Sequence, residues 1–280
     1  MQNFINPHAE KPTSFISLIN VFLKNNQLIR SMIKREVIGR YRGSLIGLAW
    51  SFFNPIFMVT AYTIVFSMIF KMRWAADGIE SKTQFGLILF AGIIIFNLFS
   101  EVINRSPNLI LSNGNYIKKV VFPVEILSIV SIGAAVFHAL ISLFVLLAAF
   151  LLFNGYLHWN VIFLPFLFMP FLILLLGISW VLASIGAFVK DAGQVITLIT
   201  TLLMFLSPVF YPLSAVPEKL KFFITMNPVT FIIEQTRGLI IYGNNPDWVG
   251  TLIYTLISAC VAWCGFYFFQ KMRKGFADAI

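Results

Sequence analysis

The side chains that could do acid–base or metal chemistry are few, and their spacing does not favour catalysis. His8, His138 and His158 are far apart in the sequence and lack the spacing of metal ligands. The carboxylates that fall near apolar runs are single residues and not pairs: Glu101, Glu125, Asp191 and Glu234. We therefore expect no catalytic residue and no metal site in this chain.

A nucleotide-binding motif is also missing. The chain contains no G-x-x-x-x-G-K-[ST] sequence, and Lys274-Gly275 lacks the rest of a phosphate-binding loop. We therefore expect no cofactor in this chain and expect a partner to bind any ATP and magnesium.

The clearest chemical feature is a group of cations. Lys34, Arg35, Arg40 and Arg42 precede an apolar run that begins at Leu45. Cationic side chains are costly to place in hydrocarbon, so this boundary predicts a membrane surface, with residues 1–44 on the cytoplasmic side.

The remaining cations follow the same rule. The chain carries 20 Lys and Arg residues and a net charge of +9. Seven of these cations precede Leu45, and other groups fall at 105–119, at 190 and at 271–274. Successive loops that alternate between many and few cations are typical of the positive-inside rule. A protein that binds nucleic acid would instead gather its cations on one face. The pattern predicts cytoplasmic termini, contact with membrane lipids and no nucleic-acid partner.

Composition agrees with a membrane protein. Of the 280 residues, 59% are hydrophobic and 11% are charged, whereas a soluble domain is about half apolar and about a quarter charged. A spanning helix needs about 20 mainly apolar residues. Six runs qualify, at about 45–70, 86–104, 126–153, 161–188, 193–211 and 249–270. We expect an all-α integral membrane protein with a transmembrane domain over 45–270 and a cytoplasmic tail over 271–280.

Apolar residues recur at helical spacing before the first run. They are Phe15, Leu18, Ile19, Phe22, Leu28, Ile29, Met32, Ile33 and Val37. Charged residues fall mostly on the opposite face. The pattern predicts one or two amphipathic helices on the inner membrane surface.

The segment 212–248 is apolar but broken by Pro217, Asn227-Pro228 and Gly243. Each apolar piece is about 11–14 residues long, which is too short to span a membrane. A further single span would also place the cations of 271–274 outside. The pattern predicts two short re-entrant helices over 212–243 that enter the outer leaflet and return.

Two further segments each allow two interpretations. The segment 105–125 has a candidate helix start, with Asn104 or Ser106 as the cap and Pro107 in the first turn. It is either an ordinary cytoplasmic loop or a short helix presented to a cytoplasmic partner. The aromatic residues from 205 to 231 either form a membrane belt and core, or line a pore with rings that slide along sugars.

Four motifs occur together and in order along the chain. They are KREVIGRYRGSLIGLAWSFFNPIF at 34–57, SNGNYIKKVVFPVEIL at 112–127, VKDAGQVITLI at 189–199, and SPVFYPLSAVP with MNPVTFIIEQTRGLIIYG across 207–243. With these motifs the chain resembles the permease subunits of polysaccharide-exporting type-2 ABC transporters. That group includes the O-antigen Wzm, capsule KpsM and teichoic-acid TagG permeases.

The resemblance implies a channel made of two copies of this chain, with two copies of a separate cytoplasmic ATPase beneath it. The N-terminal helix would lie near the entry point of a lipid-linked substrate. The segment 105–120 would be a coupling helix, and 212–243 would form periplasmic gate helices. The cargo would be a polysaccharide on polyprenyl pyrophosphate, O-antigen first, carried across the bacterial inner membrane.

The resemblance also implies roles for single residues. Arg35, Arg40 and Arg42 would contact the pyrophosphate, since a guanidinium fork suits phosphate oxygens; the alternative is that they only anchor the interface. The residues near the ATPase would be Lys118, Lys119, Phe122 and Pro123. The pore and gate residues would be Phe205, Phe210, Tyr211, Phe222, Phe223 and Phe231.

Three alternatives stay open. A capsule or teichoic-acid exporter shares these motifs. A type-2 exporter of small hydrophobic molecules would not need a continuous wide pore. A membrane enzyme that modifies glycans would act without an ATPase, so co-purification with an ATPase separates it from a transporter.

Overall fold

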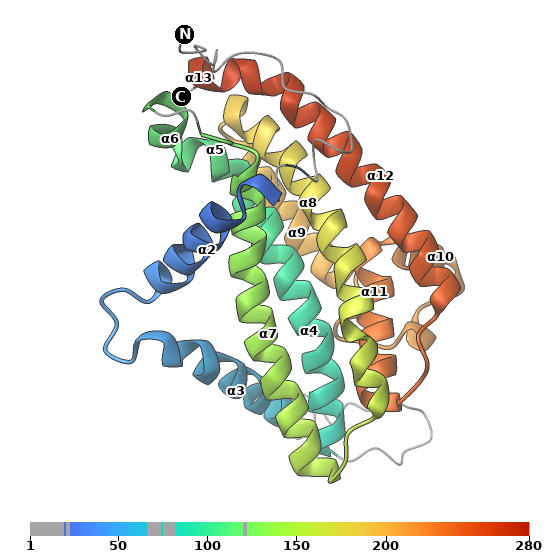
Figure 1. The fold of residues 1–280 in the computed structure, drawn as a ribbon. Coiled ribbons are helices and arrows are strands. Elements are labelled where there is room, and N and C mark those ends of the chain that lie inside the picture. The colour runs from blue at the N-terminus through green and yellow to red at the C-terminus, as the bar shows by residue number, and fades with distance from the viewer. Residues whose placement is uncertain (1–19, 21–22, 66–73, 75–81, 120–121, 280) are drawn as a thin grey trace.

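The computed structural model describes residues 20, 23–65, 74, 82–119 and 122–279. For residues 82, 117–119, 277 and 278 it describes the backbone alone. Within these ranges the regular structure is helical throughout, with no strand (Figure 1). The α-helices are α2 (Asn26–Arg40), α3 (Trp50–Tyr62), α4 (Lys82–Arg105), α5 (Leu109–Ser112), α6 (Gly114–Lys119), α7 (Ile126–Asn154), α8 (Leu164–Phe188), α9 (Ala192–Phe205), α10 (Glu218–Met226), α11 (Pro228–Arg237), α12 (Trp248–Met272) and α13 (Phe276–Ala279). Shorter turns are η1 (Gly47–Ala49), η3 (Ser106–Asn108), η4 (Trp159–Phe163), η5 (Leu213–Ala215), η6 (Gly238–Tyr242) and η7 (Arg273–Gly275).

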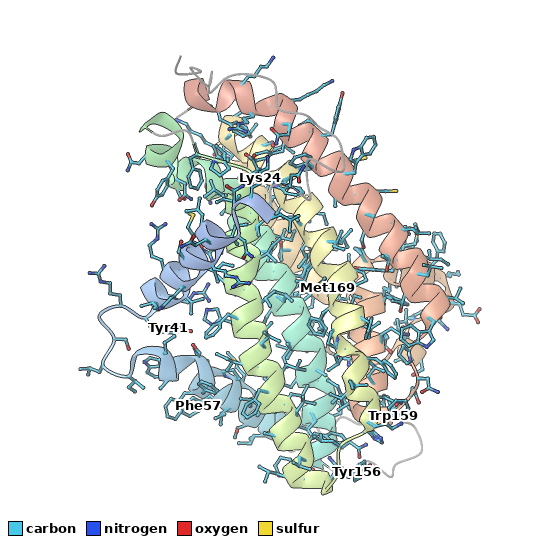
Figure 2. All side chains as sticks on the ribbon, in the orientation of Figure 1. Lys24, Tyr41, Phe57, Tyr156, Trp159 and Met169 are labelled. Carbon is cyan, nitrogen blue, oxygen red and sulfur yellow. The ribbon has the colours of Figure 1, made fainter. Side chains whose placement is uncertain are left out.

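Five helical stretches in the described ranges are long and apolar enough to cross a membrane. They are Gly47–Val65, Thr83–Ser112, Ile126–Asn154, Trp159–Phe188 and Trp248–Gly275. They match five of the six expected spans; residues 66–70 of the first expected span lie outside the described ranges. Large apolar side chains such as Phe57 and Met169, each 62% exposed, point outward from the bundle (Figure 2). The prediction of an all-α integral membrane protein is confirmed.

The expected fifth span, 193–211, contains a shorter helix. α9 has 14 residues, which is about 21 Å at the usual rise and falls short of a hydrocarbon core of about 30 Å. It ends just before Ser207-Pro208, and proline cannot continue the helical hydrogen bonding. A sixth long spanning helix is therefore not found in the part of the chain that the structure describes.

α4 occupies the centre of the bundle. About 83% of its most apolar window is buried, against 11% to 44% for the four other long stretches. It contacts α3, α7, α8, α9 and α11. The run GLILFAGIIIF at 86–96 is apolar on every side, as a helix surrounded by other helices requires.

α8 and α12 approach each other closely along their length. A Cβ atom on Gly265 would collide with the carbonyl oxygen of Gly177, and one on Gly177 would meet the backbone of Val261 and Ala262. Small residues at helix contacts allow such an approach within a membrane. Trp180 packs beside Phe266 in the same contact, with ring centroids 5.2 Å apart.

The broken segment forms two short helices, α10 and α11; that they are re-entrant stays a prediction. Pro217 precedes α10. The Asn227 side chain caps α11 by accepting a hydrogen bond from the Val229 N–H at 3.0 Å. Gly243 then ends η6 with a φ of +64°, a backbone conformation that suits glycine.

α2 keeps the expected apolar stripe and packs on the bundle through it. Ile29, Met32 and Val37 are buried, α2 contacts α7, and Ile33 fills the space that a Cβ on Gly133 would need. The earlier part of the expected stripe, Phe15, Leu18, Ile19 and Phe22, lies outside the described residues.

The expected coupling segment 105–120 is helical up to residue 119 and directly continues α4 through η3, α5 and α6. Pro107 lies in the first turn of η3, as expected. The predicted cap is wrong, because neither Asn104 nor Ser106 caps a helix here. Instead, Ser106 Oγ donates to the Val102 carbonyl at 2.6 Å within the continuous helix.

Candidate functional site

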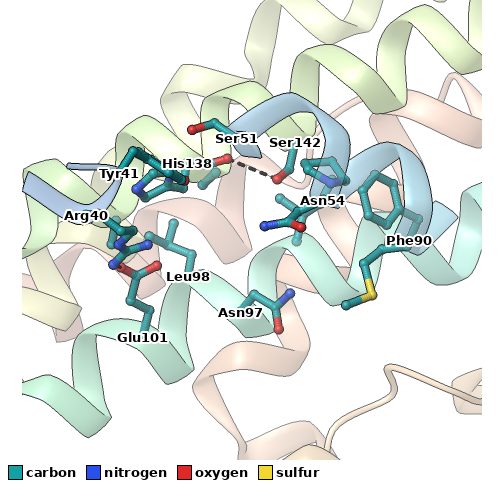
Figure 3. Close-up of a pocket in the computed structure, with 15 residues that line it drawn as sticks. Arg40, Tyr41, Ser51, Asn54, Phe90, Asn97, Leu98, Glu101, His138 and Ser142 are labelled. Carbon is teal, nitrogen blue, oxygen red and sulfur yellow. Dashed lines mark hydrogen bonds and ion pairs between the residues drawn. The ribbon is translucent and has the colours of Figure 1, made fainter. Parts of the chain in front are cut away.

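A cavity of about 320 Å³ lies between α3, α4 and α7, beside the C-terminal end of α2 (Figure 3). Its polar side chains come from all four helices and the residue that follows α2. They are Arg40, Tyr41, Ser51, Asn54, Asn97, Glu101, His138 and Ser142.

The cavity lies near the middle of α4 and α7 and opens on the surface of the bundle, because its lining residues Asn54, Met58 and Asn97 are exposed. His138 is 12 residues after the first residue of α7 and 16 before the last. On α4, every residue from 85 to 99 is buried except Asn97, which lines the cavity. Polar side chains at this depth are costly in a membrane, so their convergence marks a candidate functional site.

One end of the cavity carries a chain of ion pairs between α2 and α4. Arg40 pairs with Glu101, and Arg105 pairs with Glu36. The Arg105 Nη1 atom also lies 3.6 Å from the Glu101 Oε1 atom. Glu101 therefore lies between two guanidinium groups, and an anion that replaced it would find two cations already in place.

A second cavity, of about 480 Å³, lies on the side of the same ion pairs that faces η3 and α5. Arg40 and Glu101 line the first cavity, whereas Glu36 and Arg105 line the second. The ion-pair chain thus separates a cavity at mid-bundle from one between α2 and the η3–α5 segment.

Both cavities contain buried polar atoms without a hydrogen-bond partner in the described part of the chain. Ser51 Oγ and His138 Nε2 are in the first, and Asn104 Oδ1 and Arg105 Nη1 are in the second. Such atoms carry a desolvation cost that a bound polar group would remove.

The three arginines predicted to contact pyrophosphate are not equivalent. Arg40 lines the mid-bundle cavity. Arg35 lines the second cavity, and its guanidinium donates to the Tyr116 hydroxyl at 2.5 Å. Arg42 is exposed in the turn after α2 and lines neither cavity.

The residues predicted to meet an ATPase fall at the end of α6 and just beyond it. Lys118 and Lys119 end α6, and their side chains lie outside the described part. Phe122 is buried and stacks on Tyr116 at 5.1 Å between ring centroids. The Pro123 carbonyl accepts from the Ile126 N–H at 3.0 Å.

The α6 region is tied to the other end of the chain. The Arg273 guanidinium donates to the Glu125 carboxylate at 3.1 Å and to the Phe122 carbonyl at 3.4 Å. α13 also contacts α6, and the two lie at the same end of the bundle (Figure 1). A push on α6 would therefore reach α7 and α12.

The six aromatic residues predicted for pore and gate divide into two groups. Phe205, Phe222 and Phe223 are 61%, 64% and 68% exposed. The other three are partly buried: Phe210, Tyr211 and Phe231. Within a single chain, the two groups do not form one ring-lined surface.

The partly buried aromatics have contacts inside the chain. Phe231 stacks on Tyr254 of α12 at 5.4 Å, and Phe210 packs against the core. The Tyr211 hydroxyl donates to the Phe205 carbonyl at 2.9 Å.

Arg237 has a structural position that sequence reasoning missed. Its side chain is 1% exposed and donates to the carbonyls of Ile88, Pro208 and Val209 at 3.0, 2.5 and 2.8 Å. The guanidinium also bonds Glu234 at 3.0 Å and lies 4.3 Å from the centre of the Trp74 ring.

The uncharged polar residues of the cavity were also missed. The sequence does contain a feature that could have identified them, because Asn54 and Asn97 are polar amides inside long apolar runs. Among the described residues, no group of three or more His, Cys, Asp or Glu side chains could hold a metal ion.

A family model for the ABC-2 type transporter matches residues 27–241 of this sequence, which is more than half of it. The chain belongs to the ABC-2 type transporter family. The matched region runs from α2 to η6, so it includes both cavities, the segment 105–120 and the two short helices.

Two relatives in this family are O-antigen export system permease proteins named RfbA. The Myxococcus xanthus protein is 23% identical over 267 residues, which are 95% of this chain and 100% of the relative. A Klebsiella pneumoniae protein is 26% identical over 257 residues, which are 90% of this chain and 95% of the relative. The polysialic acid transport protein KpsM of Escherichia coli is 20% identical over 77% of this chain and 81% of its own length.

Proposed function

We propose that this chain is the channel-forming permease of an ABC transporter that exports polyprenyl-pyrophosphate-linked polysaccharide across the bacterial inner membrane. The cargo is the O-antigen of lipopolysaccharide. A separate cytoplasmic ATPase binds ATP and magnesium and drives the export.

One observation carries the choice of cargo: the similarity to O-antigen export permeases extends over 90% to 95% of this chain. The Myxococcus xanthus protein aligns over its full length and over 95% of this chain. A similarity confined to the membrane spans in one half of the chain would support membership of the family but not the choice of cargo.

The cavities suit a molecule with an anionic group next to a polar, hydroxyl-rich group. Arg40 and Arg105 offer guanidinium groups, which bind phosphate oxygens in a bidentate manner. In this proposal the pyrophosphate replaces the carboxylates of Glu36 and Glu101 as their partner, while the polyprenyl chain stays in lipid beside the exposed face of α3.

The proposed topology has six crossings and cytoplasmic termini. α9 and the turns after it form a short fifth crossing, because α4 and α8 shield one side of α9 from lipid. α10 and α11 enter the outer leaflet as gate helices and return to α12. α2 lies along the cytoplasmic interface and reaches the cavity with its last turn.

The proposed channel lies between two copies of this chain, above two copies of the ATPase. The exposed side chains of α9 and α10, including Phe205, Phe222 and Phe223, face that channel. Exposed rings allow sugar C–H faces to slide without a tight hold, which a long polymer requires.

A second cargo has a specific observation in its favour. The KpsM likeness supports capsular polysaccharide, but it covers less of this chain and has lower identity. Teichoic acid, small hydrophobic molecules and glycan modification without an ATPase are weaker alternatives.

Coupling provides the first test. In cells that lack the chromosomal copy, the Lys118→Glu, Lys119→Glu double variant should reduce surface O-antigen at least about tenfold, because acidic side chains would repel a partner surface that accepts cations. Co-purification with the ATPase should fall as well, while the amount of inserted permease should stay the same. The Lys219→Glu, Lys221→Glu double variant on α10 is the matched control and should keep the ATPase bound.

Unchanged export together with unchanged ATPase association in the Lys118 and Lys119 variant would show that the coupling assignment is wrong. Failure of the wild-type chain to co-purify with any ATPase would contradict the transporter proposal itself.

A further inference from the structure

The uncharged polar side chains of the mid-bundle cavity form a group distinct from its ion pairs. Ser51 and Asn54 come from α3, Asn97 from α4, and His138 and Ser142 from α7. Figure 3 shows Asn54 and Asn97 projecting into the space between α3 and α4. Three helices that are separate in sequence thus bring amide, imidazole and hydroxyl groups to one place.

Internal hydrogen bonds do not use all of these groups. Ser142 Oγ donates to the carbonyl of His138 at 3.0 Å, and His138 Nδ1 lies 3.4 Å from the Tyr41 hydroxyl. Ser51 is 6% exposed, and its Oγ atom has no partner among the described residues. The buried His138 Nε2 atom has none in the same part of the chain.

The remaining lining is apolar and includes Met58, Phe90 and Leu98. The cavity volume of about 320 Å³ lies near the lower end of the roughly 300–1,000 Å³ of small-molecule pockets. Amides, an imidazole and hydroxyls beside an aromatic ring suit the hydroxyls and C–H faces of one sugar ring. The cations at the adjoining end suit phosphate.

We infer that this uncharged lining is a subsite for one sugar residue, the sugar bonded to the pyrophosphate of the lipid carrier. The inference rests on the proposed function, since the pyrophosphate lies at the Arg40 end and the sugar enters between α3 and α4. Asn54 and Asn97 bond its hydroxyl or acetamido groups, and Ser51 and His138 supply the unused buried atoms.

The subsite has a consequence for specificity. It contacts the one sugar that every chain carries, whatever the length or repeat unit of the polymer. The permease therefore selects its cargo by the first sugar and leaves the rest of the chain to a wider channel.

The test measures binding of two kinds of lipid to the full-length chain with its ATPase in nanodiscs. The probes are polyprenyl pyrophosphate alone and the same carrier bearing a single N-acetylglucosamine or a single galactose. We expect the wild type to bind one of the two glycosylated carriers at least about tenfold more tightly than the bare carrier, which corresponds to two or three added hydrogen bonds.

The variants remove the polar groups without changing side-chain size greatly. Asn54→Leu and Asn97→Leu should each reduce that preference to about threefold or less and leave binding of the bare carrier unchanged. Ser51→Ala, which removes one oxygen atom only, should reduce the preference about twofold to threefold. Thr60→Val is the matched control, since Thr60 is exposed on α3, does not line the cavity and bonds only its own helix at Ile56; it should keep the full preference.

Equal binding of bare and glycosylated carriers by the wild type would overturn the subsite while leaving export of lipid-linked glycan to be judged by transport. The sugar subsite would also be overturned if Asn54→Leu, Asn97→Leu and Ser51→Ala all kept the full preference for the glycosylated carrier. Weaker binding of the bare carrier by Asn97→Leu would also overturn it, because that residue would then serve the pyrophosphate. If the two leucine variants do not fold, the preference of Ser51→Ala for the glycosylated carrier decides whether the subsite is present.

Discussion

At the scale of single residues, the paired arginines of the bundle divide into two kinds. Arg237 is fully satisfied by fixed backbone acceptors and one carboxylate, so it is part of the structure. Arg40 and Arg105 are about a third exposed and share the single carboxylate of Glu101. Only Arg40 and Arg105 can exchange partners, because loss of their ion pairs does not leave backbone carbonyls unpaired.

Replacing Arg237 should therefore damage the fold and not a binding step. Arg237→Met leaves the carbonyls of Pro208 and Val209, which lie outside a helix, without this donor, and each unmet group costs about 1–3 kcal/mol. We expect the melting temperature of the purified protein in detergent to fall by at least about 5 °C. Arg237→Lys should recover only part of the loss, because an ammonium cannot reproduce the guanidinium fork.

Arg42→Met is the control, since Arg42 is exposed and lines neither of the two cavities; its melting temperature should match the wild type. An Arg237→Met protein with unchanged stability would contradict the structural role.

Residue roles were only partly predictable from the sequence. The cationic boundary before Leu45 identified Arg40, but spacing could not show that Glu101, 61 positions later, would pair with it. Asn54 and Asn97 were counted as parts of apolar runs, since their shared cavity exists only after α3, α4 and α7 have packed. Phe231 was predicted to belong to a gate, and its stacking on Tyr254 depends on the return of α12.

At the scale of elements, helix contacts set how the bundle can move. α8 and α12 meet backbone to backbone at Gly177 and Gly265, so they form one rigid pair. α3 makes fewer close contacts and is only 11% buried in its most apolar window. Movement of α3 relative to α4 and α7 would therefore alter the mid-bundle cavity at the lowest cost.

Alanine at Gly265 should separate the rigid pair. The added Cβ meets the backbone of Gly177, which cannot rotate away as a side chain would. We expect Gly265→Ala to lower the melting temperature by at least about 4 °C, since overpacking of a close contact costs about 1–3 kcal/mol. Thermal unfolding in detergent measures the shift.

Gly39→Ala on α2 is the matched control. A Cβ there meets nothing within 4 Å, and alanine favours helix by up to about 1 kcal/mol over glycine. Its melting temperature should be equal to or above that of the wild type. If both alanine variants behave alike, α8 and α12 are not in backbone contact.

Helix positions were more predictable than helix lengths. The breaks at Pro217, Asn227-Pro228 and Gly243 were correct, because proline, an amide cap and a positive-φ glycine act locally. The early end of α9 was missed, since the apolar run continues past Phe205 and only Pro208 marks the turn. The Asn104 or Ser106 cap was wrong because the helix from α4 continues through that point.

At the scale of the whole molecule, the exposed surface remains largely apolar, as lipid and a second copy would require. Most charged side chains of the described residues lie in or beside α2, α6 and the α12–α13 end of the bundle, where the proposed ATPase docks. The ion pairs from α2 to α4 connect that end to the mid-bundle cavity, and the bond between Arg273 and Glu125 joins α12 to the start of α7.

Transport in a purified system tests the central claim most directly. The chain and its ATPase are placed in liposomes with a polyprenyl-pyrophosphate-linked polysaccharide, and an enclosed glycosidase reports glycan that has crossed. The account predicts ATP-dependent cleavage that is lost when this chain is omitted or when a non-hydrolysable ATP analogue is used. Cleavage that is equal without the chain, or ATPase activity that responds to small hydrophobic drugs but not to the lipid-linked glycan, would contradict it.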